Sequence, residues 1–278
     1  MPTSKHMPER DYALGHDARE LRRLAAQSDY WGEETFELLT RAGISRGMRV
    51  LDLGSGAGDV SFLAARMVGD TGSVLGIDRA AAAVEAATRR AAGMQLSNVR
   101  FQVAELDALR PEGRFDAIIG RLVLLYLREP ARVLANIAQS LDPGGIVAFL
   151  EMEMDSTHAV PPVAAVQQPY NCMVEAFRRS GASIKLGPQL WRVFRDAGLP
   201  QPQMFARTTI EAAPAVGGTT LLAETIRSML PMMESTGVVK PGEVEIESLA
   251  QRMQQGLSDA QATLIMPNLV GAWARLSE

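Results

Sequence analysis

The chain has 278 residues, of which 47% are hydrophobic and 22% are charged, and its formal net charge is −4. This length fits one enlarged domain with additions, and the composition is that of a folded globular protein. The acidic balance argues against a nucleic-acid partner, because nucleic-acid binders carry basic patches that neutralise phosphates.

Two further features concern the environment of the chain. A single cysteine, Cys172, excludes an internal disulfide. The first twenty residues are polar, without a secretory signal, and no stretch reaches the ~18 apolar residues of a membrane span. We therefore expect a cytoplasmic protein with no membrane span.

The first half of the chain predicts helices followed by alternating strands and helices. A helix begins at Asp17, which can cap it with Glu20 in capping-box spacing, and a second covers 33–42 and stops at Gly43. Apolar runs predict strands at 48–53, 73–78, 99–104, 115–120 and 145–151. Helical periodicity predicts helices near 60–68, 80–92 and 130–141, with a turn at 142–145. This alternation predicts an α/β fold with a parallel sheet, helices on both faces and a ligand site at the carboxyl ends of the strands.

The rhythm breaks after residue 151. The pattern predicts helices near 163–180 and 190–197, a strand at 204–210, two amphipathic helices within 219–257 and a last strand at 268–275. We divide the chain into a helical N-terminal extension (1–43), a nucleotide-binding core (44–151) and a segment that completes the sheet (152–278). The helices of 219–257 would form a lid inserted before the last strand.

The most specific motif is the glycine loop DLGSGAG at 52–58, which follows a strand and opens a helix. A dinucleotide loop has the spacing G-x-G-x-x-G and places a pyrophosphate at the helix N-terminus. Here the third glycine comes one residue early and Asp59 follows it, so a pyrophosphate would be repelled. Asp52 adds negative charge suited to the sulfonium and ammonium groups of S-adenosylmethionine (SAM). Asp78 ends the second strand, where a carboxylate can accept ribose hydroxyls.

With these motifs in place, residues 48–151 resemble a class I SAM-dependent methyltransferase of the ubiquinone/menaquinone-biosynthesis-like type. VLDLGSGAGD, GIDRA, VAELD, FDAIIGRLVLLYL and LDPGGIVAFLE match its five motifs in order. The resemblance implies a Rossmann-like, seven-stranded, mostly parallel sheet whose final strand is antiparallel, with 204–210 and 268–275 as its last two strands. Glu105 is expected to meet the adenine amino group, with Asp107 as the alternative. The implied cofactor-binding residues are Asp52, Gly54, Ser55, Gly56, Asp78, Arg79, Glu105, Leu106 and Arg121.

The N-terminal segment DYALGHDARELRRLAAQ resembles an extension that closes over the cofactor in bacterial members of this family. It adds Gln27 as a candidate contact to SAM or the substrate. Methionines on the 219–257 helices suggest an adaptable apolar surface for a hydrophobic acceptor, although such a stripe is more often core. These helices and the N-terminal segment also offer a homo-oligomer interface. The candidate substrate-binding residues are Tyr12, Tyr30, Trp31, Tyr126, Met229 and Met233.

The acceptor chemistry is only partly constrained by the sequence. The position after the fourth strand lacks the Asn/Asp-Pro-Pro-aromatic run of nucleobase amino-methylating enzymes, and Cys172 is not in a Pro-Cys pair. Candidate catalytic bases are His16 and Glu151, and no metal-ligand cluster is visible. If the acceptor is an alkene, aromatic faces such as Tyr126, Tyr170 or Trp191 would stabilise a carbocation instead.

We therefore predict a SAM-dependent methyltransferase that acts on oxygen or carbon of a hydrophobic small molecule, such as a natural product or an isoprenoid-like acceptor. One alternative is a SAM-binding regulatory or assembly protein without catalysis. Another is a nucleotide-dependent oxidoreductase, which the glycine spacing and Asp59 disfavour.

Overall fold

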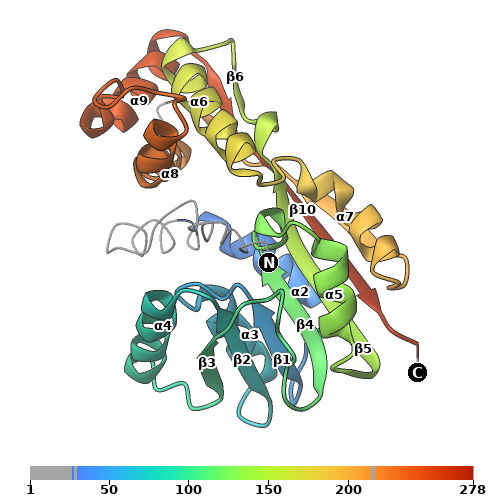
Figure 1. The fold of residues 1–278 in the computed structure, drawn as a ribbon. Coiled ribbons are helices and arrows are strands. Elements are labelled where there is room, and N and C mark those ends of the chain that lie inside the picture. Colours follow the sequence, from blue (N-terminus) through green and yellow to red (C-terminus); the bar gives the residue numbers. More distant parts are fainter. Residues whose placement is uncertain (1–26, 28–29, 214–216, 278) are drawn as a thin grey trace, which may run out of the picture.

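The computed structural model describes residues 27, 30–213 and 217–277, which form two lobes (Figure 1). The first half of the described chain contains α2 (Gly32–Ala42), β1 (Arg49–Leu53), α3 (Asp59–Val68), β2 (Ser73–Asp78), α4 (Ala81–Gly93), β3 (Val99–Val103), β4 (Phe115–Arg121), the 3-10 helix η1 (Leu124–Tyr126), α5 (Pro130–Ala138) and β5 (Leu141–Glu153). The second half contains η2 (Met154–Ser156), β6 (His158–Val160), α6 (Ala164–Ser180), α7 (Leu186–Asp196), β7 (Gln203–Arg207), β8 (Ile210–Ala212), α8 (Gly217–Ser235), η3 (Ile246–Ser248), α9 (Leu249–Asp259), β9 (Thr263–Ile265) and β10 (Asn268–Arg275).

The lower lobe is built on a seven-stranded sheet in the order β3-β2-β1-β4-β5-β10-β7. Strands β1 to β5 run parallel, whereas β10 is antiparallel to both of its neighbours, β5 and β7. The apolar runs of β1 and β4 are almost entirely buried, as a parallel sheet between two layers of helices requires. The predicted fold class is confirmed, and the predicted last strand coincides with β10.

Helices cover both faces of this sheet. Leu38 of α2 and Phe62 of α3 belong to an apolar cluster on one face. Leu134 of α5 and Phe194 of α7 belong to a second cluster on the other face. The central parallel strands are therefore buried between two layers of helices, whereas the edge strand β3 is partly exposed. The carboxyl ends of β1 to β5 lie together at the edge that faces the upper lobe (Figure 1).

The upper lobe contains a second sheet that the sequence did not predict. It has three antiparallel strands in the order β6-β9-β8. The predicted strand at 204–210 is wrong in its extent, because it divides into β7, paired with β10, and β8, paired with β9. Pro267 gives the physical reason. Proline has no amide hydrogen for the strand ladder, so it separates β9 from β10, and their partner strands β8 and β7 are separated as well.

The two lobes share one apolar core. The cluster that contains Leu38 also contains Met173 of α6, Ile226 of α8 and Met253 of α9. The long strands β5 and β10 run from the large sheet toward this upper lobe (Figure 1). The predicted boundaries at residues 43 and 151 stay predictions. Residues on both sides of each boundary belong to this one core.

The turn predicted at 142–145 is instead an irregularity within β5. Phe115 pairs with Leu141 and Ala117 pairs with Ile146, so β5 inserts extra residues between two successive pairings with β4. A bulge of this kind bends a strand without ending it. The apolar run after it keeps its pairing and leads directly to the carboxyl edge of the sheet.

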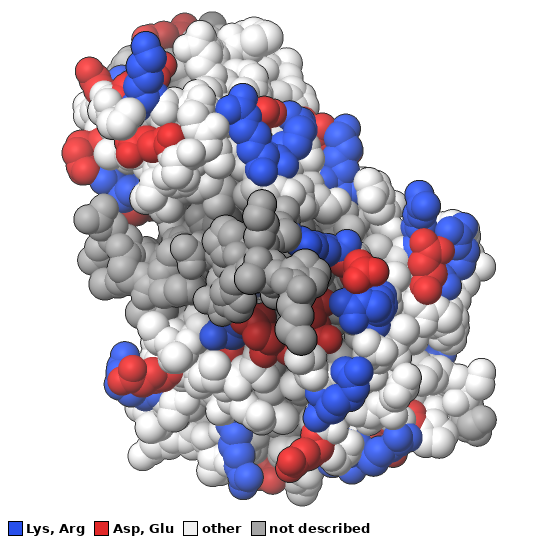
Figure 2. Space-filling view, in the orientation of Figure 1, with Lys and Arg blue, Asp and Glu red and all other residues white. Residues whose placement is uncertain are grey.

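The described surface mixes charges of both signs. Figure 2 shows Lys and Arg beside Asp and Glu over much of the visible face. Arg132, for example, lies 3.0 Å from Asp107 and 2.9 Å from Glu129. Within the described helices, none is long and apolar enough to cross a membrane.

Candidate active site

A cavity of about 210 Å³ lies at the carboxyl edge of the large sheet, between the two lobes. Its lining has two chemically different ends. The polar end follows β1 to β4 and is lined by Gly54, Gly56, Asp78, Arg79, Glu105, Leu106, Asp107 and Arg121. The apolar end faces the upper lobe and is lined by Trp31, Leu125, Tyr126, Leu127, Met152, Met154, Tyr170, Met173, Phe177, Leu221, Leu222, Met266 and Pro267. Gln27 and Thr225 add two polar side chains to the lining.

The glycine loop brings bare backbone to the polar end. Gly54 has φ +66°, a left-handed conformation that side chains rarely adopt. A Cβ placed on Gly54 would lie 2.4 Å from Cγ2 of Val123, so only glycine fits against that side chain. The amide of Ser55 donates to the carbonyl of Ile77 at 2.9 Å, which ties the loop to β2. The loop is therefore held open and close to the cavity.

Asp78 joins the glycine loop to the start of α4. Its Oδ2 accepts from the amide of Gly56 at 2.9 Å and its Oδ1 accepts from the amide of Ala80 at 2.8 Å. Each carboxylate oxygen has further lone pairs. The Asp78 side chain lines the cavity and can still accept hydroxyl donors there.

Asp52 is buried beneath the loop, with 1% of its surface exposed. Its Oδ2 accepts from Ser61 Oγ at 2.5 Å, and its Oδ1 has no hydrogen-bond partner among the described residues. Burial raises the pKa of Asp52 to about 7, while Ser61 and the nearby Arg121 oppose that rise. The orphaned oxygen and the unfavourable burial of its charge both fit a cationic ligand close by.

Asp59, at the start of α3, has a positively charged partner. Arg90 donates to Asp59 Oδ1 at 2.6 Å, and the Asp59 side chain is 12% exposed. The positive partner offsets the negative charge at the start of α3, so repulsion of a pyrophosphate is weaker than the sequence suggested. The preference for a cationic ligand therefore depends mainly on Asp52.

The third-strand motif offers two carboxylates at the cavity. Asp107 is 3.0 Å from Arg132 in an ion pair, whereas Glu105 has no ion pair within the described part of the chain. Glu105 is exposed beside Leu106, and both line the polar end. This geometry favours Glu105 over Asp107 as a hydrogen-bond acceptor for a ligand.

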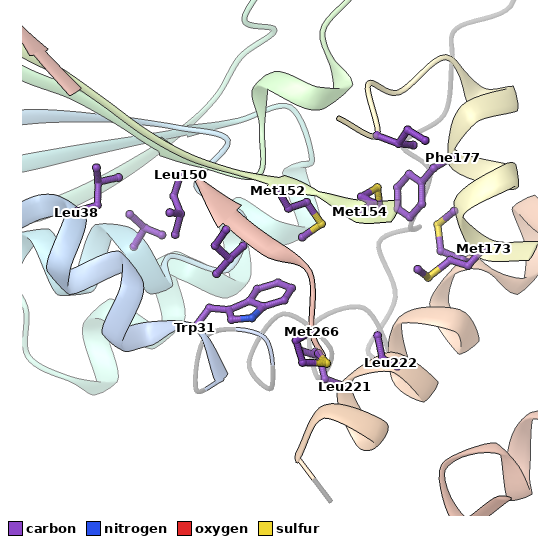
Figure 3. Packing of buried hydrophobic residues seen from close by; sticks show 14 of the residues in the cluster. Trp31, Leu38, Leu150, Met152, Met154, Met173, Phe177, Leu221, Leu222 and Met266 are labelled. Atoms are coloured by element: carbon purple, nitrogen blue, oxygen red, sulfur yellow. The ribbon is translucent and has the colours of Figure 1, made fainter. Parts of the chain in front are cut away.

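The apolar end is formed by residues from distant parts of the chain. Figure 3 shows Trp31, Met152 and Met266 near one another, and Met154 beside Phe177 and Met173. The ring centroids of Tyr126 and Phe177 are 6.3 Å apart. Among the described residues that line this end, there is no Asp, Glu or His. The described lining of this end is therefore apolar and aromatic and contains no strong base.

Two predicted substrate contacts on α8 are corrected by the structure. Met229 and Met233 are fully buried in the core and do not line the cavity. The cavity contacts only the first turns of α8, at Leu221, Leu222 and Thr225. The methionines that do line it are Met152, Met154, Met173 and Met266. The alternation of Met and Glu at the end of β5 was the signal that could have identified the first two.

The N-terminal candidates are distributed differently from the prediction. Trp31 and Gln27 line the cavity, whereas Tyr12 and His16 lie outside the described residues. Tyr30 does not line the cavity. Its hydroxyl donates to Glu211 Oε1 at 2.6 Å, and burial together with that carboxylate raises the pKa of Tyr30.

Three further predicted residues do not line the cavity either. Trp191 lies on α7, 43% exposed, with Arg195 stacked on its ring. Ser55 is buried within the glycine loop, and its Oγ has no partner in the described chain. Asp52 lies behind the loop, so its contribution to ligand binding would be electrostatic.

The structure does not support Glu151 as a base that touches substrate. Glu151 is fully buried and absent from the cavity lining, because successive side chains of β5 alternate and Met152 takes the cavity side. Its Oε1 accepts from the amides of Val123 and Leu124 at 3.0 and 2.7 Å. Burial raises the pKa of Glu151 to about 8, and these amides oppose the rise.

Comparison with known proteins gives three relevant findings. Residues 44–192, more than half of the chain, match the family described as "Methyltransferase domain". Aklanonic acid methyltransferase DauC of Streptomyces sp. (strain C5) is 38% identical over 104 residues, covering 37% of this chain and 47% of that protein. The ubiquinone/menaquinone biosynthesis C-methyltransferase UbiE of Enterobacter sp. (strain 638) is 28% identical over 184 residues, covering 60% of this chain and 72% of that protein.

Among solved structures, phosphoethanolamine N-methyltransferase 2 of Haemonchus contortus, in complex with S-adenosyl-L-methionine, has a similar fold. It is 17% identical, with a TM-score of 0.54, and the similarity covers 88% of this chain and 53% of that one. The chain thus aligns with less than half the length of the aklanonic acid enzyme and about half of this neighbour.

Proposed function

This chain belongs to the methyltransferase-domain family, and on that premise we propose that it transfers a methyl group from SAM to oxygen or carbon of an apolar small molecule. The family membership confirms the predicted family, the Rossmann-like class of fold and SAM as the cofactor. The identity of the acceptor and the methylated atom belong to the proposal. The observation that carries it is the cavity, whose polar end suits a nucleoside with a cationic tail and whose other end is apolar.

The residues of the polar end fit SAM in their chemistry. The bare backbone at Gly54 and Gly56 allows close approach, and Asp78 and Glu105 supply acceptors for hydroxyl and amino groups. The buried charge of Asp52, with one unpartnered oxygen, favours a cation. SAM supplies an electrophilic methyl group when it is bound.

The apolar end would hold the acceptor and exclude water. Methyl transfer gains most from an aligned acceptor atom and from the removal of competing solvent. Trp31, Met152 and Phe177 provide such surroundings, and aromatic faces such as that of Tyr126 can stabilise developing positive charge. Because this described lining lacks Asp, Glu and His, we expect an acceptor that is readily deprotonated or reacts at carbon. His16 remains the candidate base from outside the described residues.

The names of the two relatives refer to small-molecule acceptors. One is named for aklanonic acid, and the other for C-methylation in ubiquinone and menaquinone biosynthesis. The two similarities cover 37% and 60% of this chain, so they support a small-molecule acceptor and not its identity.

The proposal is tested with SAM that carries a trideuterated methyl group. The purified protein is incubated with hydroxylated polycyclic aromatics, prenylated quinols and, as polar controls, glycine and phosphoethanolamine. Mass spectrometry should find the label on an apolar compound, with S-adenosylhomocysteine (SAH) released in equal amount. A His16→Ala variant would lose oxygen methylation if that histidine removes the acceptor proton.

Two outcomes would contradict the proposal. Labelling confined to the polar controls would refute the apolar acceptor. Tight SAH binding without label transfer to any compound would favour the alternative, a SAM-binding protein without catalysis.

A further inference from the structure

One short segment forms the wall between the two ends of the cavity. It follows β4 and covers residues 122–127. Leu122, Val123, Leu125, Tyr126 and Leu127 all line the cavity. Val123 also packs directly on the glycine loop, because its Cγ2 occupies the space that a Cβ on Gly54 would need. A shift of this segment would therefore disturb both ends together.

The segment has an unusual backbone that needs external hydrogen-bond partners. Leu122 has φ +54°, a left-handed conformation that is rare for a branched side chain. The amides of Val123 and Leu124 stand at the start of η1, where the first amides of a helix have no acceptor within the helix. Glu151 supplies one acceptor to both, since its Oε1 lies 3.0 Å and 2.7 Å from the two nitrogens. The far side of the segment is held by Ser183, whose amide donates to the carbonyl of Leu125 at 2.8 Å.

The burial of Glu151 is hard to explain as packing. A fully buried carboxyl group is unfavourable in an apolar core, where leucine or methionine would fill the same space. Its Oε2 has no partner in the described chain, and no ion pair to Glu151 occurs there. What the carboxyl group does is accept the two amides at the start of the segment.

We propose that Glu151 is a positioning residue, whose buried carboxyl group fixes the 122–127 segment so that Val123 stays on the glycine loop and Tyr126 faces the acceptor. The inference rests on the proposed function, because it assigns the residue to the geometry of that site. It replaces the role of substrate base that the sequence suggested. Strand β5 then supplies both the support for the segment and, through Met152, part of the acceptor surface.

The test compares Glu151→Met, which removes the acceptor, with Glu151→Gln, whose amide oxygen can still accept both N–H groups. Glu153→Gln is the matched control, because Glu153 lies two residues further along β5. Its Oε2 accepts a hydrogen bond from Asn268 Nδ2 at 2.9 Å and not from an amide of the 122–127 segment. Hydrogen exchange of peptides covering 122–127, SAH affinity by calorimetry and urea unfolding are measured on each. Urea unfolding separates a local effect from a general loss of stability.

We expect Glu151→Met to accelerate exchange in 122–127 at least tenfold relative to β1 and β2 peptides, and to weaken SAH binding roughly five- to tenfold. Glu151→Gln should recover most of both, and Glu153→Gln should match the wild type. If Glu151→Met does not fold, Glu151→Asp decides, because its shorter side chain cannot reach both amides.

The inference would be overturned if the wild type binds SAH and a folded Glu151→Met or Glu151→Asp variant stays within twofold of it. Both the hydrogen exchange of the 122–127 segment and the affinity for SAH are compared. A Glu151→Gln variant as impaired as Glu151→Met would also overturn it, because a neutral acceptor would then not suffice. Failure of wild type to bind SAH would instead count against the proposed function.

Discussion

Cofactor affinity should depend on pH through Asp52. Burial raises the pKa of this carboxyl to about 7, so in the ligand-free protein it is mostly protonated below that pH. A bound sulfonium and ammonium favour the ionised carboxylate and would return its pKa toward the ordinary value of 3.8. Binding of SAM then releases a proton at acid pH, and affinity rises with pH until Asp52 is ionised in both states.

The size of this effect follows from the pKa shift. One pKa unit corresponds to about 1.4 kcal/mol, or tenfold in affinity. Between pH 5 and pH 7 the dissociation constant of SAM should fall roughly fiftyfold, and above pH 8 it should be nearly constant. The folding stability of the free protein changes with pH in the opposite direction. Because the pKa of Asp52 is higher in the folded chain than in the unfolded chain, its protonation stabilises the fold below the unfolded pKa. This stabilisation is lost as pH rises through 7.

Calorimetry with SAM in two buffers of different ionisation enthalpy measures both affinity and proton release. Near pH 6 the wild type should release about one proton on binding. The Asp52→Asn variant should bind more weakly at pH 8 and lose the slope, and any titration of SAM itself cancels between the two proteins. A wild-type slope that persists in Asp52→Asn would refute the role of Asp52, as would affinity that is independent of pH.

Three further predictions test separate contacts. Burial raises the pKa of Glu151 to about 8 from 4.5. Between pH 5.5 and 7.5, the unfolding free energy of the wild type, measured by urea titration, should therefore fall by about 1.4 kcal/mol per pH unit relative to that of Glu151→Gln. A difference between the two proteins that does not change with pH would contradict this. Gly54→Ala places a methyl group at φ +66°, 2.4 Å from Val123 Cγ2, and should cost about 2–4 kcal/mol and weaken SAH binding at least tenfold; wild-type affinity would show that the loop tolerates the clash. Tyr30→Phe removes the 2.6 Å hydrogen bond to Glu211 and should lower stability by about 1.5 kcal/mol in thermal unfolding; an unchanged Tm would mean that water replaces the hydroxyl.

Local motifs in the sequence predicted most of the residues that meet at the polar end of the cavity, and their role in binding SAM stays a prediction. The glycine loop, Asp78 and Glu105 lie within a few residues of strand ends, and parallel strands bring their carboxyl ends to one edge. Because each position follows from the strand that precedes it, no long-range contact had to be known.

The apolar end of the cavity depends on contacts between distant segments, and two residues predicted from the sequence to lie there do not line it. Met229 has the helical spacing of an inward-facing residue, but the cavity ends one turn before it on α8. Glu151 follows the apolar run of β5, but strand alternation turns it away from the cavity and brings Met152 in. The three-residue strands of the small sheet are too short to have a sequence pattern, although Pro267 indicated the break between β9 and β10.

Binding of SAH to the polar end of the cavity shows whether this chain uses SAM as its cofactor. The purified protein is titrated with SAH in a calorimeter, with NAD as a control ligand and Asp78→Ala as the variant. We predict micromolar binding of SAH, no binding of NAD and at least a tenfold loss in Asp78→Ala, because that carboxylate lines the cavity and holds the glycine loop. A folded wild-type protein that binds NAD in preference to SAH, or binds neither, would contradict the account.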